Sequence, residues 1–296
     1  MTQFLSLVLN GVSLGTMYAL IALGFVIIFK SSGVVNFAQG SFLLLGAYAI
    51  VRLTGPLGFW LGALTGIALT AAVAIAVERL IINRLRGTSD ISLAVVTIGV
   101  DIVLLTDLTR RIGSDILNVP HPWGGDVIRL GDVGISTNRA LAIVVAGVLI
   151  GLFFAAFKYS DWGVAMRAVA EDADTAALMG IRQGRVSAIA WLVAGVLAAV
   201  AALFLVGAPT PGVSPAVYTV ALGAFPAAIL GGLDSTGGAL AGGLLIGVAE
   251  ALAAGYQDQL LFLGRGFGAV VPYLVMIVVL LIRPSGLFGT RELTRV

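Results

Sequence analysis

The chain has 296 residues, of which 59% are hydrophobic and only 11% charged, and its formal net charge is +2. Because a soluble domain needs roughly a quarter of its residues charged to cover its surface, this composition excludes a soluble enzyme and indicates an integral membrane protein. The absence of cysteine and the single histidine, His121, argue against disulfides and against a transition-metal site. The small net charge gives no indication of nucleic-acid binding.

Charge-free apolar stretches along the chain are long enough to cross a membrane, since about 20 apolar residues span the hydrocarbon core. We expect helices near 6–29, 37–51, 57–77, 91–108, 139–157, 186–206, 217–230, 238–254 and 267–282. The stretches 37–51 and 217–230 are short for full crossings, so each is a candidate for a re-entrant or broken helix. The first cation is Lys30, which favours a retained first span over a cleaved signal peptide.

The expected fold is therefore all-α, a polytopic membrane protein with about eight or nine transmembrane helices in a single membrane domain over 1–296. Lys and Arg gather in the segments 78–90 and 158–185 and in the tail after residue 282. By the positive-inside rule these segments lie in the cytoplasm and the N-terminus lies outside. The segment 109–138 also carries arginines and is an exception that the other segments outweigh.

Polar residues near the first span and within the membrane are candidates for a translocation pathway. Asn36 is a plausible N-cap of the helix that follows it; alternatively Asn36, Phe37 and Gln39 lie on the pathway, where neutral amides could pass a zwitterion without trapping it. Asp101 lies midway along its span, and a charge there is costly. We expect it either to face the pathway or to pair with a polar group at a helix contact. Glu250 is expected to be interfacial or paired.

Glycines spaced four residues apart recur along the chain. Such spacing lets helix backbones approach closely in lipid. The favoured interpretation is tight packing within the chain, with a subunit interface or a sliding surface as the alternative. The sets are Gly11/Gly15, Gly58/Gly62/Gly66, Gly238/Gly242, Gly243/Gly247 and Gly264/Gly268.

The cytoplasmic loop 158–185 is expected to form two short amphipathic helices. Ser160 or Asp161 can cap the first, Asp172 can cap a second over 173–179, and Gly180 suits a left-handed stop. The loop is expected to present a small apolar surface for another protein, although helices resting on lipid headgroups remain an alternative. The surface would consist of Ala168, Ala176, Ala177, Leu178 and Met179, edged by Arg167, Glu171 and Asp174.

Four stretches in the same order along the chain resemble permease subunits of branched-chain amino-acid ABC importers. They are GVVNFAQGSF at 33–42, RAVAEDADTAALMGI at 167–181, the glycine-rich run at 227–250, and RPSGLFG at 283–289. The resemblance implies the all-helical fold shared with ribose-type permeases and residence in the bacterial inner membrane. It further implies a homologous second permease subunit, two cytoplasmic ABC ATPases and an external solute-binding protein.

In that family the loop helix ending near Gly180 docks into a groove of the ATPase. The resemblance therefore assigns ATPase coupling to Arg167, Glu171, Asp172, Asp174, Ala176, Ala177, Leu178 and Gly180. One departure is Ser41, where many relatives carry an acidic residue, so no carboxylate role transfers to that position. Relatives also carry urea, short amides or aromatic acids, which leaves the substrate class open around branched-chain amino acids.

The chain itself contains no nucleotide-binding motif. The nearest candidate runs from Gly24 to Ser31, but Phe29 replaces the second glycine and the run lies in a membrane span. ATP is therefore expected to be used by partner subunits, with no cofactor in this chain and no enzymatic activity of its own. An ion-coupled secondary transporter using Asp101 or Glu250, and a channel-like scaffold, are the alternatives. The outer loop 207–215 is either a rigid turn or a surface that receives a binding protein.

Overall fold

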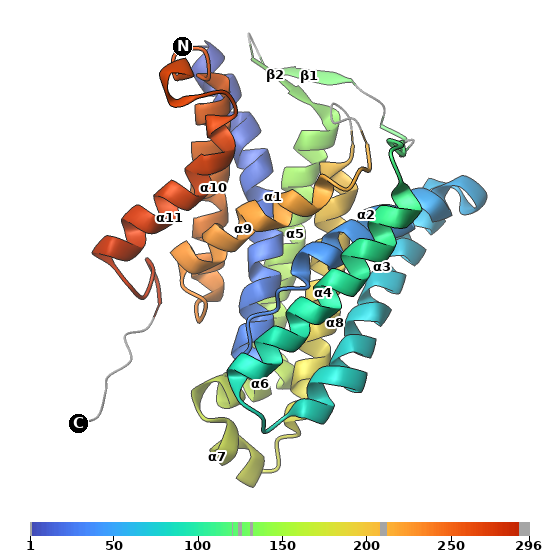
Figure 1. The fold of residues 1–296 in the computed structure, drawn as a ribbon, viewed down its shortest axis with the longest axis vertical. Coiled ribbons are helices and arrows are strands. Elements are labelled where there is room, and N and C mark those ends of the chain that lie inside the picture. The colour runs from blue at the N-terminus through green and yellow to red at the C-terminus, as the bar shows by residue number, and fades with distance from the viewer. Residues whose placement is uncertain (1, 120, 124–125, 131–132, 208–211, 290–296) are drawn as a thin grey trace.

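The computed structural model describes residues 2–119, 121–123, 126–130, 133–207 and 212–289. The chain folds into a bundle of helices with one small hairpin (Figure 1). The helices are α1 (Thr2–Ser32), α2 (Gln39–Leu57), α3 (Phe59–Val77), α4 (Asp90–Ile112), α5 (Thr137–Tyr159), α6 (Asp161–Glu171), α7 (Ala173–Leu178), α8 (Gln183–Leu205), α9 (Val217–Gly231), α10 (Thr236–Gly255) and α11 (Val271–Ile282). A π-turn (Glu78–Ile82) and a 3₁₀ turn (Asn83–Leu85) extend α3, and further 3₁₀ turns cover Leu261–Leu263 and Phe267–Val270.

The predicted all-α membrane fold is confirmed. Within the described residues, seven helices are long and apolar enough to span a membrane: α1, α2, α3 with its extension, α4, α5, α8 and α10. Two further apolar helices, α9 and the stretch Phe267–Ile282 that contains α11, are shorter. All nine apolar stretches expected from the sequence are thus helical. The short antiparallel hairpin of β1 (Val127–Leu130) and β2 (Val133–Ser136) lies in a segment for which the sequence predicted only a loop.

Of the two stretches predicted to be too short for a full crossing, 217–230 forms a short helix and 37–51 does not. The second becomes α9, with 15 residues, whereas the first becomes α2, with 19 residues. The charge of Arg52 does not end α2, because its guanidinium lies 5.3 Å from the centre of the Tyr48 ring, a favourable cation–π geometry. Pro56 lies in the last turn, where few backbone bonds remain to be lost. The chain turns only at Gly58, which has φ +76°.

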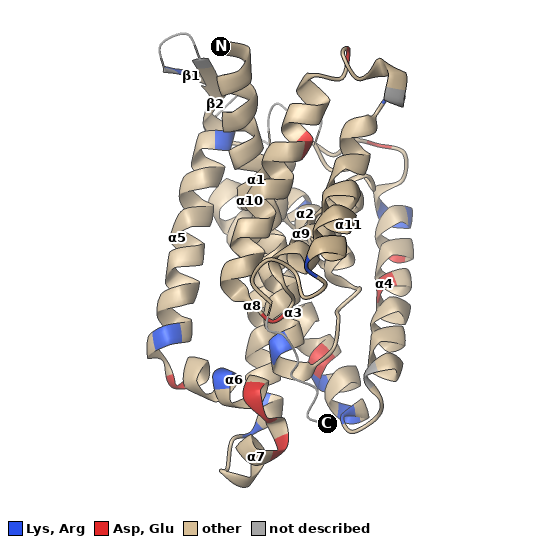
Figure 2. Ribbon diagram, turned by 90° about the vertical axis from the view of Figure 1, so that its left-hand side faces the viewer, with Lys and Arg blue, Asp and Glu red and all other residues tan. Residues whose placement is uncertain are grey.

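The centre of the bundle is formed by α1 and α8. In their most apolar windows 83% and 72% of residues are buried, against 22% for α4 and α5. A helix that is hydrophobic on all sides suits a position surrounded by other helices. Charged residues gather toward the two ends of the bundle, and α6 and α7 carry both signs at one end (Figure 2). That end is the one assigned to the cytoplasm by the distribution of Lys and Arg.

The glycine spacing serves close contacts within the chain. A Cβ on Gly247 would overlap the Cα of Gly15, and a Cβ on Gly11 would lie 2.7 Å from the Cα of Val248. Gly242 approaches the Ala227 carbonyl of α9 just as closely. These contacts support the packing interpretation for the glycines of α1 and α10, whereas a Cβ on Gly58 or Gly264 would have no atom within 4 Å.

We expect Gly247→Leu to destabilise the protein. The added side chain overlaps the backbone of α1, and overpacking of this kind typically costs about 1–3 kcal/mol. The melting temperature of the protein in detergent should fall accordingly. Gly147→Leu is the matched control, since a Cβ added to this residue in the middle of α5 would have no atom within 4 Å. Equal melting temperatures for the two variants would contradict the assignment of this contact.

Candidate functional site

The turn between α1 and α2 holds two of the predicted pathway residues, Asn36 and Gln39, both fully buried. Asn36 Nδ2 donates to Gln39 Oε1 at 3.3 Å, and Gln39 Nε2 donates to the Ala194 carbonyl of α8 at 3.4 Å. Asn36 is not the N-cap of α2, which is Ala38; its Oδ1 instead accepts the Ala38 N–H at 3.1 Å. In this conformation the two amides tie the turn to α8.

Phe37, the third pathway candidate on this turn, points outward. Its side chain is 38% exposed and its ring lies 6.0 Å from the Phe225 ring of α9. Its backbone N–H donates to Thr97 Oγ1 of α4 at 3.1 Å. The turn is therefore fixed to α4 on one side and faces α9 on the other.

Asp101 joins three helices near the middle of the membrane. The residue is 7% exposed, and both of its carboxylate oxygens accept short hydrogen bonds. Ser41 Oγ of α2 donates to Oδ1 at 2.6 Å, and Tyr218 Oη of α9 donates to Oδ2 at 2.7 Å. Of the two interpretations that the sequence left open, this geometry matches pairing at a helix contact.

Tyr218 is the member of this cluster that the sequence did not reveal. Gly40 leaves room for its ring, because a Cβ at that position would lie 2.6 Å from the Tyr218 ring. The same geometry explains what Ser41 does. Its hydroxyl donates to Asp101, whereas an acidic residue at position 41 would place a second carboxylate against the first.

The segment 158–185 has the local structure that its sequence predicts. Ser160 caps α6 by accepting the Gly163 N–H at 3.1 Å, and Asp172 caps α7 by accepting the Thr175 N–H at 2.9 Å. Gly180 has φ +86° and its N–H donates to the Ala177 carbonyl at 3.0 Å. Local capping signals thus define both short helices.

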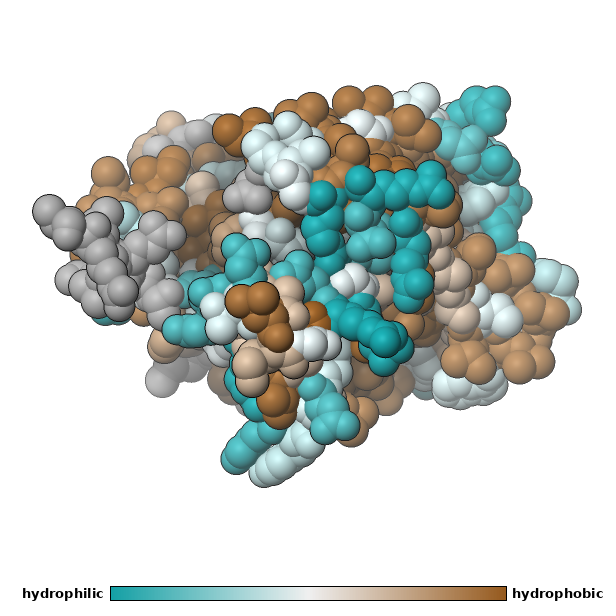
Figure 3. All heavy atoms as spheres, turned by 90° about the horizontal axis from the view of Figure 1, so that it is seen from below, coloured by the Kyte–Doolittle hydropathy of each residue, from teal (hydrophilic) through white to brown (hydrophobic). Residues whose placement is uncertain are grey.

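The tip of this segment carries exposed apolar side chains. Leu178 is 88% exposed and Met179 is 80% exposed. Viewed from below, the end of the molecule that carries α6 and α7 presents hydrophilic residues with a small hydrophobic patch among them (Figure 3). The prediction was wrong for Ala176, which is 4% exposed because α7 turns that face toward the bundle. Arg167 is exposed but folds back on α5, where its guanidinium donates to the Phe157 carbonyl and lies over the Phe157 ring.

The cap at Asp172 makes α7 sensitive to acid. The Thr175 N–H stabilises the carboxylate and holds the pKa of Asp172 below its usual value of about 3.9. Because the folded pKa is the lower one, the stabilisation is present above about pH 4 and is lost as the pH falls through the folded pKa. We expect Asp172→Ala to accelerate amide hydrogen exchange at Thr175 several-fold at neutral pH. Asp174→Ala, two positions along the chain, is the control that should leave this amide protected.

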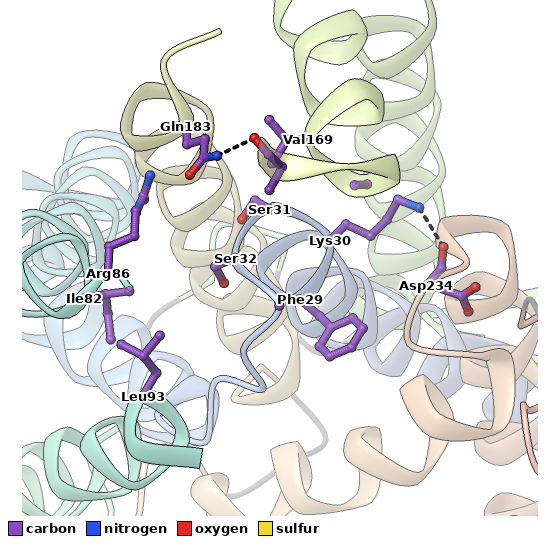
Figure 4. Close-up of a pocket in the computed structure, with 13 residues that line it drawn as sticks. Phe29, Lys30, Ser31, Ser32, Ile82, Arg86, Leu93, Val169, Gln183 and Asp234 are labelled. Carbon is purple, nitrogen blue, oxygen red and sulfur yellow. Dashed lines mark hydrogen bonds between the residues drawn. The ribbon is translucent and has the colours of Figure 1, made fainter. Parts of the chain in front are cut away.

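A cavity of about 300 Å³ separates α6 and α7 from the end of α1 and the α3–α4 connection (Figure 4). Residues that line the cavity make two hydrogen bonds between different elements. Gln183 Nε2 of α8 donates to the Ala173 carbonyl of α7 at 2.5 Å, and Lys30 Nζ of α1 donates to the Asp234 carbonyl at 2.7 Å. The first bond joins α7 directly to α8, and the second joins the C-terminal end of α1 to the turn between α9 and α10.

The remaining candidates lie outside these clusters. Asp234 is in the turn between α9 and α10, as expected for a cytoplasmic turn. Glu250 accepts a hydrogen bond from Tyr18 Oη at 2.6 Å, which makes it one of the paired groups anticipated from the sequence. The centre of the outer loop, 208–211, and the basic residues of the tail, Arg291 and Arg295, lie outside the described residues.

The sequence matches one protein family over residues 7–280, described as the branched-chain amino acid transport system permease component. The chain is 33% identical to the high-affinity branched-chain amino acid transport system permease protein LivH of Salmonella typhimurium, over 99% of this chain and 98% of that protein. It is 32% identical to LivH of Escherichia coli K12 over the same shares. It is 31% identical to BraD of Pseudomonas aeruginosa, again over 99% and 98%.

Proposed function

The chain belongs to the family of branched-chain amino acid transport permeases, and from this premise we propose that it imports hydrophobic amino acids, with leucine, isoleucine and valine as the first candidates. It is a multi-pass protein of the inner (plasma) membrane and a permease of the ABC importer type. The energy comes from two cytoplasmic ATPases that dock on the 158–185 segment. A homologous second permease subunit and an external solute-binding protein complete the transporter.

The observation that carries this proposal is the exposed apolar tip of α7. Leu178 and Met179 stand almost fully exposed at the end of the molecule assigned to the cytoplasm. Apolar side chains grouped on a polar surface are typical of a protein–protein contact. The lower end of Figure 1 shows α7 projecting beyond α6 and beyond the ends of the long helices. This position favours docking to a protein over a helix lying among lipid headgroups.

The contacts around α7 supply a route from the ATPase to the membrane. The bond from Gln183 to the Ala173 carbonyl holds α7 against α8, and Val169 of α6 lines the cavity that α1 closes from the other side. After α1 the chain passes through Phe37, whose N–H donates to Thr97 of α4, to Gln39, whose side chain donates to the Ala194 carbonyl of α8. ATP binding can bias the conformation of the permease only if it favours one arrangement of these contacts over another.

The face that carries α9 is the surface we assign to the second permease subunit. A helix of 15 residues rises about 22 Å, less than the roughly 30 Å of a hydrocarbon core. Its N-terminus lies at mid-membrane, because Tyr218 bonds to Asp101 halfway along α4. Non-helical backbone at that depth is tolerated only against protein or a water-filled cavity. The neighbouring Phe37, Leu222 and Ile102 are exposed and available for such a contact.

The proposal is tested by uptake of labelled leucine into proteoliposomes that contain this chain, its partner permease, the two ATPases and the binding protein. We expect uptake that requires ATP and is competed by isoleucine and valine. A folded complex that imports urea, a short amide or benzoate instead of leucine would retain the mechanism and overturn the substrate. Leucine uptake that proceeds without ATP, driven by a proton or sodium gradient, would overturn the mechanism.

A further inference from the structure

A second intramembrane carboxylate, Glu250, lines a small cavity between α1, α9, α10 and the start of α11. The cavity has a volume of about 200 Å³. This is below the roughly 300–1,000 Å³ of pockets for drug-sized ligands, so only a small molecule or part of one fits. Its polar lining consists of Glu250, Tyr18, Tyr273 and Thr219, and its apolar lining includes Val220, Leu222 and Pro272.

The Glu250 carboxylate is incompletely satisfied by the protein. Tyr18 Oη donates to Oε2 at 2.6 Å, and this is the hydrogen bond that the carboxylate makes among the described residues. Among the described residues, no ion pair with a nitrogen–oxygen distance of 4.0 Å or less involves Glu250. An ionised carboxylate at membrane depth without a counter-charge is costly. A cation in the cavity would offset that cost.

The contrast with Asp101 singles out Glu250 as the carboxylate that can take a ligand. Each of the two carboxylates accepts a hydrogen bond from a tyrosine hydroxyl, and both lie near the first turns of α9, Asp101 through Tyr218 and Glu250 through the cavity that Thr219 and Val220 line. Asp101 has donors on both oxygens, from Ser41 and from Tyr218. Glu250 has a donor on one oxygen only, and it is half-buried beside an open cavity.

The cavity lining fits a primary ammonium group on a short branched alkyl chain. A carboxylate beside tyrosine rings recognises an ammonium through charge and through the negative faces of the rings. The apolar side chains of Val220, Leu222 and Pro272 suit the alkyl part. Leu222 and Tyr273 are 44% and 37% exposed, so the cavity opens on the same surface as α9.

We propose that Glu250, Tyr18 and Tyr273 form a subsite that binds the ammonium group of the transported amino acid. The inference rests on the proposed function for the identity of the cargo, but the recognition of an alkylammonium does not depend on transport. The bond from Tyr18 orients the carboxylate, and the free oxygen of Glu250 receives the ammonium. The contact is a single ion pair beside exposed side chains, which permits release as well as capture.

The test compares two small ligands with the same alkyl chain and opposite charge. Purified protein in detergent is titrated with isopentylammonium chloride or with sodium 4-methylpentanoate, and the melting temperature is followed by intrinsic fluorescence. A ligand that binds only the folded protein raises this temperature in a saturable manner. We expect isopentylammonium to do so and 4-methylpentanoate to have no effect. Equal responses to the two ligands, or no response to either, would overturn the subsite.

Two variants separate binding from a structural role of the Tyr18–Glu250 bond. Tyr18→Phe removes the orienting bond but keeps the carboxylate and the ring, so isopentylammonium should still raise its melting temperature, at a higher ligand concentration than for the wild type. Glu250→Gln should lose that response, and if it does not fold, the wild-type comparison of the two ligands remains decisive. In the reconstituted transporter we expect Glu250→Gln to lower leucine uptake at least tenfold while ATP hydrolysis persists. Unchanged uptake in Glu250→Gln would overturn the subsite but not the proposed function. Failure of the wild type to import leucine would overturn the proposed function but not the subsite.

Discussion

Leu178→Glu is expected to abolish ATP-driven uptake while the protein still inserts and folds. The side chain is 88% exposed, so the substitution disturbs no contact within the chain. In the proposed complex, however, it places a carboxylate in an apolar contact with the ATPase, where an unpaired buried charge is strongly unfavourable. Uptake into proteoliposomes should fall at least tenfold, and the ATPases should no longer co-purify with the permease. The melting temperature of the isolated chain should not change.

Ile91→Glu provides the control for this experiment. Ile91 is 77% exposed at the first turn of α4, outside the 158–185 segment. A general intolerance of negative charge at the cytoplasmic end would affect both variants, whereas a docking role is specific to Leu178. Gly180→Pro should reproduce the Leu178 phenotype, because proline cannot adopt φ +86° and the end of α7 would be lost. Normal uptake in both Leu178→Glu and Gly180→Pro would refute docking at this segment.

Asp101→Ala is expected to destabilise the protein and to stop transport. The substitution leaves the hydroxyls of Ser41 and Tyr218 without their shared acceptor in the middle of the membrane. Hydrogen bonds to a charged group are worth about 1.5–3 kcal/mol each, so we expect a loss of about 3 kcal/mol or more in the free energy of unfolding. The melting temperature in detergent and leucine uptake should both fall.

A second acidic residue on the same helix offers a comparison. Asp107 pairs with Arg110 and Arg111 on the exposed surface of α4. Because exposed ion pairs contribute little to stability, Asp107→Ala should melt close to the wild-type temperature. To separate stability from transport, Asp101→Asn keeps the shape of the side chain and one acceptor oxygen. If Asp101→Ala melts like the wild type, the three-helix contact is not what holds α9 in place.

The parts of this structure that the sequence predicted are those governed by nearby residues. Ser160, Asp172 and Gly180 each act on backbone groups within a few positions, so the ends of α6 and α7 could be located in advance. The long apolar stretches were equally clear, since their length and lack of charge are set by the hydrocarbon core. Ala176 was misplaced because its orientation depends on how α7 rests on the bundle.

The contacts that define the membrane interior could not be predicted in the same way. Tyr218 lies 117 positions from Asp101, and Tyr18 lies 232 positions from Glu250. Nothing in the spacing of either pair signals a hydrogen bond. The sequence could show that Asp101 and Glu250 were costly in a membrane and therefore needed partners, but only the packing of α9 and α10 against the other helices identifies those partners.

The contact between α1 and α10 has a consequence for the synthesis of this protein. The surface of α1 that carries Gly11 and Gly15 is covered by Gly247 and Val248, which are made near the end of the chain. The ribosome adds about 5–20 residues per second, so on the order of ten seconds or more pass between the synthesis of α1 and the synthesis of α10. During that interval the first helix, which ends up surrounded by protein, faces lipid or the insertion machinery. A ribosome that stalls before α10 therefore leaves an assembly intermediate whose central helix is uncovered, a natural substrate for membrane quality-control proteases.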